Sequence, residues 1–436
     1  MSRHRERRAR QPPPGTHLNL NVRGMGASAT VAIDARADAL RARGAQIVKL
    51  GLGQSPFPVP EPVVTALRMH AHEKDYLPTA GLPALRDAIA AYTRRACGIE
   101  RRGEDVLVGP GSKELMFLLQ LVYYGDLVVP SPSWVSYAPQ ARIVGRRVRW
   151  VETSGASGWH LHPEQLEALC AEDPGRPRIF VLNYPGNPTG TTYRLEELRA
   201  LADVARRHKV VLLSDEIYGE LPHMGQHVSV ARFYPEGTIV SSGLSKWCGA
   251  GGWRLGYFVF PPTLHWLREA MTAAASETYT STSAPIQYAA VRAFEGGETL
   301  EAYLRRSRRV LGALGRWAAR TLRSSGADCP APDGAFYLFP DFSPLRERLA
   351  RRGIATSREL TEAILEQLGI ALLPGVVFGR RAEELTLRIA YVDFDGAAAL
   401  EAAAGLDGSR LDEAFLRRIA PRVVDAIERL AGWVAE

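Results

Sequence analysis

Residues 241–256 read Ser-Ser-Gly-Leu-Ser-Lys-Trp-Cys-Gly-Ala-Gly-Gly-Trp-Arg-Leu-Gly. The apolar run Thr238-Ile239-Val240 precedes them, so Lys246 follows the end of a segment that is expected to be buried. Burial and nearby cations such as Arg254 lower the pKa of a lysine, which leaves a free amine able to form a Schiff base. A solvated surface lysine is the alternative. The glycines of this stretch lack the GxGxxG spacing and follow a lysine rather than a strand, so we exclude a nucleotide-binding loop.

The apolar runs on either side of this stretch predict the fold class. Between residues 63 and 320, helical stretches alternate with continuous apolar runs at 106–108, 127–129, 179–182, 210–213, 238–240 and 256–260. Such runs are typical of strands buried on both faces, as in a mainly parallel sheet covered by helices. We therefore expect an α/β protein with a large domain built on a mainly parallel sheet and a smaller α+β domain.

The chain divides into four expected segments. Residues 1–20 form an Arg- and Pro-rich tail, expected to be disordered, and residues 21–62 a segment that joins the small domain and includes a helix from Ser28 to Gly44. Residues 63–320 make up the large domain and residues 321–436 the small one. We expect an Arg-rich helix at 299–325, followed by strands at 334–339 and 385–390 and one last helix at about 411–435. We assign no function to the Ala-rich stretch 396–405.

Composition excludes several classes of protein. The net charge of the 436 residues is +7, but residues 1–10 carry five arginines against Glu6, so the basic balance does not indicate nucleic acid. No apolar run reaches the length of a membrane span, and no signal-peptide core is present. The four cysteines lie far apart, which argues against disulfides or structural zinc. We expect a cytoplasmic protein that binds neither a metal, nucleic acid nor a membrane. Only five of its 54 basic residues are lysines that could supply an amine.

Polar side chains follow three other predicted strands, where open α/β sheets bind ligands. Asp215 ends a buried strand and needs a cationic partner, although a helix N-cap is the simpler alternative. Tyr218 lies three residues further on. The loop 183–190, constrained by prolines and glycines, presents Asn187. The sequence Gly109-Pro110-Gly111-Ser112-Lys113 opens a helix whose free N–H groups suit an anion, or forms only a tight turn.

Together these clusters resemble the class I aminotransferases, the fold-type I enzymes dependent on pyridoxal 5′-phosphate. Residues 243–256 match the family's attachment-site pattern, and residues 187–190 and 215–218 match its other two signatures in the same order. The likeness covers about residues 20–395. It is strongest to the prokaryotic aspartate/aromatic branch, which residues 28–32, Tyr76, 132–137 and 334–337 also resemble. The resemblance implies a large domain with a seven-stranded, mainly parallel sheet.

The resemblance also implies roles for single residues. Lys246 would hold the cofactor through its amine and move the proton of the substrate α-carbon, and Asp215 would pair with the pyridine nitrogen. The remaining expected contacts are Tyr218 and Asn187 with the ring's 3′ oxygen, Trp134 stacked on the ring, Ser112, Lys113 and Arg254 at the phosphate, Tyr76 at the phosphate of the neighbouring subunit, Arg388 on the substrate α-carboxylate, and Gly53 at the close approach of the substrate. Trp134 and Asn187 would contact substrate too. Some family members have Ser where this chain has Gly243; whether Ser242 or Ser245 replaces that hydroxyl is open.

The function implied by the resemblance is transamination by a homodimer. An amino group would pass from an L-amino acid, aspartate or an aromatic one, to a 2-oxo acid such as 2-oxoglutarate by a ping-pong mechanism. A lyase or synthase of the same fold, acting by elimination or cyclisation, would use the same residues and remains the alternative. A cofactor-binding transcriptional regulator is not expected, because the 20-residue head is too short for a helix-turn-helix unit.

Overall fold

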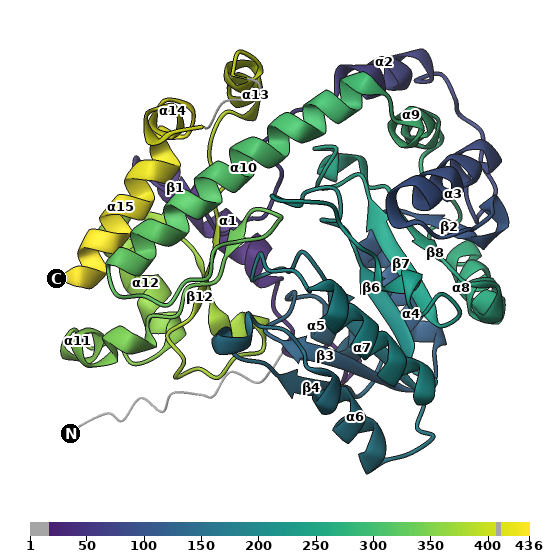
Figure 1. Ribbon diagram of the computed structural model, residues 1–436, viewed down its shortest axis with the longest axis horizontal. Helices are drawn as coiled ribbons and strands as arrows, with labels where there is room; N and C mark the ends of the chain where they lie inside the picture. Colours follow the sequence, from purple (N-terminus) through teal and green to yellow (C-terminus); the bar gives the residue numbers. More distant parts are fainter. Residues whose placement is uncertain (1–16, 407–410) are drawn as a thin grey trace, which may run out of the picture.

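The computed structural model describes residues 17–406 and 411–436. Most of the tail expected to be disordered, residues 1–16, lies outside them. Within them, a seven-stranded sheet has the order β2-β8-β7-β6-β5-β3-β4 (Figure 1). Only β8 is antiparallel to its neighbours. The expected mainly parallel sheet is therefore confirmed. Its strands are β2 Val106–Gly109, β3 Asp126–Ser131, β4 Val148–Glu152, β5 Arg178–Asn183, β6 Val211–Asp215, β7 Thr238–Gly243 and β8 Gly256–Val259.

Helices cover both faces of this sheet, which explains why its strands read as continuous apolar runs. Successive residues of a strand point to opposite faces. On β5, Ile179 and Val181 pack with the helices of one face, whereas Phe180 and Leu182 pack with those of the other. The α-helices within the described residues are α1 Ala29–Arg41, α2 Glu61–Met69, α3 Pro83–Cys97, α4 Ser112–Val122, α5 Tyr137–Ile143, α6 Pro163–Glu172, α7 Leu195–Arg207, α8 His265–Ser276, α9 Ala284–Glu295, α10 Glu298–Ser324, α11 Arg346–Arg351, α12 Ser357–Leu368, α13 Gly396–Ala404, α14 Glu413–Ile419 and α15 Pro421–Ala435.

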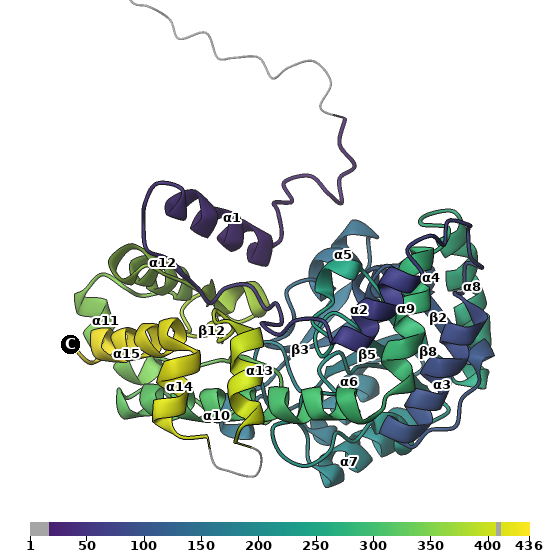
Figure 2. The ribbon, with the colours of Figure 1, turned by 90° about the horizontal axis from the view of Figure 1, so that it is seen from above.

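A second group of elements lies at one end of the long helix α10 (Figure 1). Its strands β9 Tyr337–Leu338, β11 Leu373–Pro374 and β12 Leu387–Ala390 form an antiparallel sheet in the order β11-β12-β9. Near the N-terminus, β1 Val48–Lys49 pairs in parallel with β10 Ile370–Ala371. Figure 2 shows α1 lying over this part. The domain boundaries at residues 62 and 320 stay predictions, and α10 continues across the second.

The structure corrects two expectations. The prediction of one last helix at 411–435 is wrong, because α14 and α15 are separate helices. Ala420, which precedes Pro421, has a non-helical backbone (φ −135°, ψ 49°), as residues before proline tend to have. The edge strand β4 was missed, since half-exposed residues such as Arg149 hide its pattern. The Ala-rich stretch forms α13, capped by Asp395. Among the described helices none is both long and apolar enough to cross a membrane.

A row of three glycines shapes the sheet where the site will lie. Gly109, Gly256 and Gly243 stand side by side on β2, β8 and β7. A Cβ atom on Gly256 would lie 2.1 Å from the backbone nitrogen of Ser112, the first residue of α4. A Cβ on Gly243 would lie 2.7 Å from the carbonyl oxygen of Leu255. Only glycine therefore allows the start of α4 to rest directly on β8.

Replacement of Gly256 by alanine tests this close approach. The added methyl group meets backbone that cannot move away cheaply, so we expect the free energy of unfolding to fall by about 1–3 kcal/mol. Urea denaturation measures it. Gly432→Ala is the control, because a Cβ there meets nothing within 4 Å and α15 should gain up to about 1 kcal/mol. Equal stability of Gly256→Ala and the parent protein would contradict the packing described.

Candidate functional site

A cavity of about 490 Å³ lies beyond the carboxyl ends of β5, β6 and β7. Every site residue predicted from the sequence lines it except Tyr76. Tyr76 lies outside the cavity and is 89% exposed. Residues from both groups of elements line it, including Trp134 from the large sheet's side and Arg388 from β12. Its main lining residues are Thr30, Gly53, Gln54, Ser112, Lys113, Trp134, Asn183, Asn187, Asp215, Tyr218, Ser245, Lys246, Arg254, Tyr337 and Arg388.

Lys246 points into this cavity from the loop after β7. Its Nζ donates a hydrogen bond to the carbonyl oxygen of Gly53 at 2.7 Å and lies 5.9 Å from the centre of the Tyr218 ring. The enclosed position, and then the charges of Arg388 and Arg254, lower the pKa of Lys246 to about 8. Roughly a tenth of this amine is therefore uncharged at pH 7, far more than for an ordinary lysine, and nucleophilic attack on a carbonyl group requires the uncharged form.

Asp215 ends β6 and is 4% exposed. One carboxylate oxygen, Oδ2, accepts a hydrogen bond from the Tyr137 hydroxyl at 2.5 Å, whereas Oδ1 is buried and has no hydrogen-bond partner in the part of the chain that the structure describes. Burial raises the pKa of Asp215 to about 6. A buried carboxylate oxygen that lacks a donor and borders a cavity fits a ligand carrying an N–H group. We assigned no role to Tyr137 from the sequence, because its contact depends on how α5 lies against β6.

Asn183 is a second residue that sequence reasoning missed. It lies opposite Asp215 in the register of β5 and β6. Its side-chain amide donates to the Asp215 carbonyl at 2.9 Å and accepts from the Asn187 backbone at 2.8 Å. Its position at the end of β5, directly before the constrained loop, was the signal that could have found it. Asn183 thus fixes the loop that carries Asn187 beside the carboxylate.

Arg388 is 1% exposed, and its guanidinium has no counterion among the described residues. It has no ion pair with a described carboxylate; its Nη1 donates to Asn187 Oδ1 at 2.9 Å, its Nη2 donates to the Gly51 carbonyl, and its Nε has no partner. The guanidinium carbon lies 4.8 Å from the ring centre of Tyr337 and 5.1 Å from that of Phe378. A fixed, buried guanidinium bordering a cavity is suited to a planar carboxylate.

A pair of tyrosines lies beside Lys246. The hydroxyl groups of Tyr218 and Tyr337 are 2.7 Å apart, and burial raises the pKa of Tyr218 well above its usual value. A Cβ on Gly53 would lie 1.9 Å from the Tyr337 hydroxyl oxygen. Only glycine fits at position 53, because the backbone there passes close to the Tyr337 ring. The same close approach places the Gly53 carbonyl within hydrogen-bond distance of Lys246.

The first turn of α4 forms an anion-binding corner with Arg254. Gly111 precedes Ser112 and Lys113 with φ 93°, and a Cβ there would lie 2.3 Å from Arg254 Nη2. Arg254 itself has φ 55°, and its Nη1 donates to the Gly251 carbonyl at 2.8 Å. The free N–H groups and dipole of the helix, together with the guanidinium, favour an anion.

The structure also bears on the glycine at position 243. Because a Cβ there would strike the backbone of Leu255 and Gly256, no serine fits. The hydroxyl of Ser242 donates to the Glu216 carbonyl at 3.3 Å and does not line the cavity, whereas Ser245 does. Of the two, Ser245 is placed to face a ligand. No cluster of three metal-ligating side chains exists among the residues described.

Comparison with known proteins gives one consistent result. The family model "Aminotransferase class I and II" matches residues 45–403. An aspartate aminotransferase of Geobacillus stearothermophilus is 35% identical over 71% of this chain and 78% of its own length. An aspartate/prephenate aminotransferase of Thermus thermophilus is 34% identical over 70% of this chain and 76% of its own. The solved aspartate aminotransferase from Thermus thermophilus with maleate has a TM-score of 0.79 and 33% identity, covering 89% of this chain and 98% of that one.

The unpaired oxygen of Asp215 predicts a pH-dependent stability of the apoprotein. The pKa of Asp215 is about 6 in the folded chain against an ordinary 3.8, so the folded form binds more protons in that range. Its free energy of unfolding therefore falls as pH rises from about 4 to 6 and stays lowered above. Asp215→Asn should raise that free energy by about 1–3 kcal/mol at pH 7.5 and change it little below about pH 4.

Denaturant titrations at both pH values check this expectation. Asp126→Asn is the matched control, because this buried carboxylate pairs with Arg176 at 2.9 Å and its loss should destabilise the protein. A loss of stability in Asp215→Asn at pH 7.5 would contradict this expectation, because it would show that the ionised carboxylate does not destabilise the folded apoprotein.

Proposed function

Because the chain belongs to the class I and II aminotransferases and is a transaminase of fold type I, we propose that its amino donors are aspartate or an aromatic L-amino acid. The acceptor is a 2-oxo acid such as 2-oxoglutarate, and the two half-reactions follow each other at one site. The relatives named above are transaminases, so elimination or cyclisation is not favoured. One observation carries the proposal: Lys246, the unpaired oxygen of Asp215 and the unpaired cation Arg388 border the same cavity.

The residues present fit pyridoxal 5′-phosphate, the cofactor of this family. Asp215 Oδ1 offers a buried acceptor for the protonated pyridine nitrogen, and the first turn of α4 with Arg254 offers an anion site for the phosphate. Trp134 and the Tyr218 hydroxyl, with Asn187, offer the contacts proposed for the ring and its 3′ oxygen. When bound, this group supplies an electron sink that stabilises negative charge at the substrate α-carbon.

Lys246 is the base that moves the proton. Its pKa of about 8 leaves Nζ able to accept a proton from the substrate α-carbon and to give it back near neutral pH. The Gly53 carbonyl orients the amine from one side. Asp215 keeps a negative charge near the cavity, and its own contact with Tyr137 holds the carboxylate in one orientation.

Arg388 binds the substrate α-carboxylate. Because its guanidinium is held by Asn187 and by the Gly51 carbonyl, little rotational freedom is lost when a carboxylate binds. Among the described residues that line the cavity, Lys113, Lys246 and Arg254 are further basic side chains, and Asp215 is the one carboxylate. This excess of positive charge supports an acidic substrate in addition to the phosphate, whereas the aromatic walls support an aromatic one.

The proposal includes a cytoplasmic homodimer. The phenol of Tyr76 is exposed and lies outside its own chain's cavity, as a residue donated to a neighbouring site would. In this arrangement Tyr76 reaches the cofactor phosphate of the other subunit. The division into a large domain at 63–320 and a small domain at 321–436, joined by residues 21–62, belongs to the same proposal.

A screen of the common L-amino acids against 2-oxoglutarate tests the proposed function. We expect oxo-acid formation from aspartate or the aromatic amino acids, and parallel double-reciprocal plots when both substrates are varied. The reaction without acceptor is the control and should stop after one equivalent per site. Continued release of product without an acceptor oxo acid would contradict transamination and favour a lyase.

A further inference from the structure

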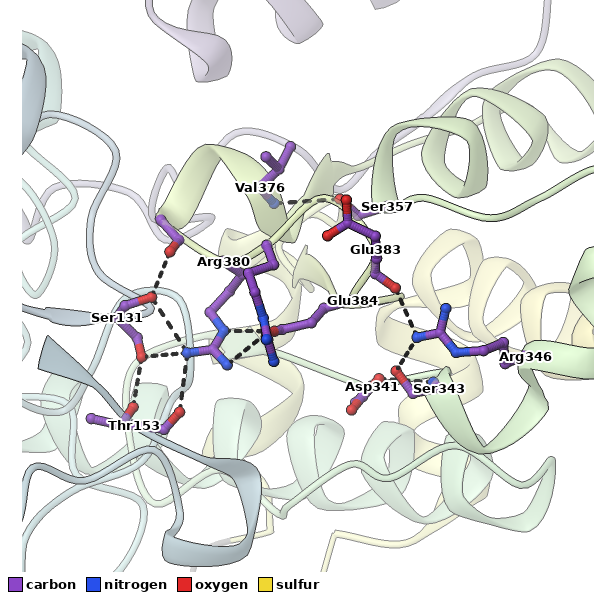
Figure 3. Close-up of polar contacts among 12 residues, drawn as sticks. Ser131, Thr153, Asp341, Ser343, Arg346, Ser357, Val376, Arg380, Glu383 and Glu384 are labelled. Carbon is purple, nitrogen blue, oxygen red and sulfur yellow. Dashed lines mark hydrogen bonds and ion pairs between the residues drawn. The ribbon is translucent and has the colours of Figure 1, made fainter. Parts of the chain in front are cut away.

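The segment from Gly375 to Glu384 joins β11 to β12, the strand that carries Arg388. On one side it is held by the C-terminal elements: the Val376 backbone donates to the Ser357 hydroxyl at 3.4 Å, and Arg346 donates to the Glu383 carbonyl at 2.8 Å (Figure 3). On its other side it reaches the edge of the large sheet. It is therefore a bridge between the two groups of elements that enclose the cavity.

The side chain of Arg380 makes most of the contacts on the large-sheet side. Its Nη1 donates to the carbonyl oxygens of Ser131 at 2.8 Å and Thr153 at 3.0 Å, just where β3 and β4 end (Figure 3). Its Nε and Nη2 form a two-point ion pair with Glu384 at 2.7 and 3.0 Å. The side chain is 8% exposed, and its guanidinium carbon lies 5.0 Å from the centre of the Trp159 ring. Only a guanidinium can satisfy carbonyls and a carboxylate in this fork geometry.

Two further hydrogen bonds to backbone carbonyls lie beside the Arg380 contacts. The Ser131 hydroxyl donates to the Gly379 carbonyl at 2.7 Å, and the Ser133 backbone donates to the Phe378 carbonyl at 2.9 Å. Phe378 is fully buried and lies beneath the guanidinium of Arg388. Ser133 is followed by Trp134, which lines the cavity and packs against the apolar cluster that contains Phe378.

We propose that Arg380 is a positioning residue for the substrate carboxylate. Arg380 does not line the cavity and touches no reacting atom. By fastening the segment 375–384 to the ends of β3 and β4, it fixes Phe378 under Arg388 and sets the distance between Arg388 and the Trp134 wall. The inference rests on the function proposed above and adds to it a residue that the catalytic motifs do not include.

The test compares Arg380→Ala with Arg381→Ala in the holoenzyme. Arg381 is the matched control, because it is the next residue, is 71% exposed and pairs with the same Glu384. We expect Arg380→Ala to raise the KM of the amino donor and the Kd of the dicarboxylate maleate about tenfold, with kcat and the Kd of pyridoxal 5′-phosphate within about threefold of the parent. Calorimetric titration with maleate, which has no amino group, measures binding without turnover. Arg381→Ala should match the parent.

A double-mutant cycle shows whether Arg380 acts through Arg388. If it does, adding Arg380→Ala to Arg388→Lys should change the maleate Kd by less than about twofold, because coupled residues are not additive. Effects that multiply independently would overturn the proposal. So would an unchanged maleate Kd in Arg380→Ala, even with a lowered melting temperature, since the contact would then be structural only.

A variant that fails to fold and a parent protein that lacks the proposed function can both be told apart from a failure of the inference on Arg380. If Arg380→Ala does not fold, Arg380→Lys takes its place: it keeps the charge but loses the fork, and an unchanged maleate Kd in it overturns the proposal equally. If the parent protein itself neither transaminates nor binds maleate, the proposed function fails, whereas an active parent with unaffected Arg380 variants overturns only the inference on Arg380.

Discussion

The carboxylate of Asp215 is buried with one oxygen hydrogen-bonded and the other unpaired, and the rest of the site is built around it. Tyr137 supplies the one side-chain donor, and Asn183 on the adjacent strand holds the neighbouring backbone. An isolated carboxylate in such a position lowers the stability of the empty fold. Lys246, which borders the same cavity, offsets part of this cost, because its positive charge favours the ionised carboxylate. Asp215 and Lys246 have opposite charges and favour each other's ionised form, whereas Arg388 and Lys246 repel each other, which favours the neutral amine.

The backbone decides how closely these groups approach one another. The row of glycines across β2, β8 and β7 lets α4 begin against the sheet, so that its free N–H groups face the cavity. Gly53 also allows a close approach, because its lack of a side chain leaves room for the Tyr337 hydroxyl. Its carbonyl oxygen accepts the hydrogen bond from Lys246 Nζ. Arg388 depends in turn on the bridge made by Arg380. The chemistry is thus concentrated in a few side chains, and their spacing is set by backbone contacts.

The sequence was most informative where one strand determines a residue's surroundings. Asp215 and Lys246 each follow a continuous apolar run, so their burial and position at the sheet's edge could be predicted. Contacts that depend on packing between distant segments could not: Tyr137 meets Asp215 across 78 positions of sequence, and Arg380 meets Ser131 across 249. The break at Pro421 was also missed, since apolar periodicity continues through it. The edge strand β4 was not predicted, because most of its residues are at least partly exposed and polar residues interrupt its apolar run.

The most direct test of the account is to locate the cofactor on the chain. Borohydride reduction of the purified holoenzyme, followed by proteolysis and mass spectrometry, should find one phosphopyridoxyl group per chain, attached to Lys246. The chain has only four other lysines, so the assignment is unambiguous, and Lys113 in the same cavity is the internal control. Attachment to Lys113, or no attachment in protein that carries cofactor absorbance, would contradict the central claim.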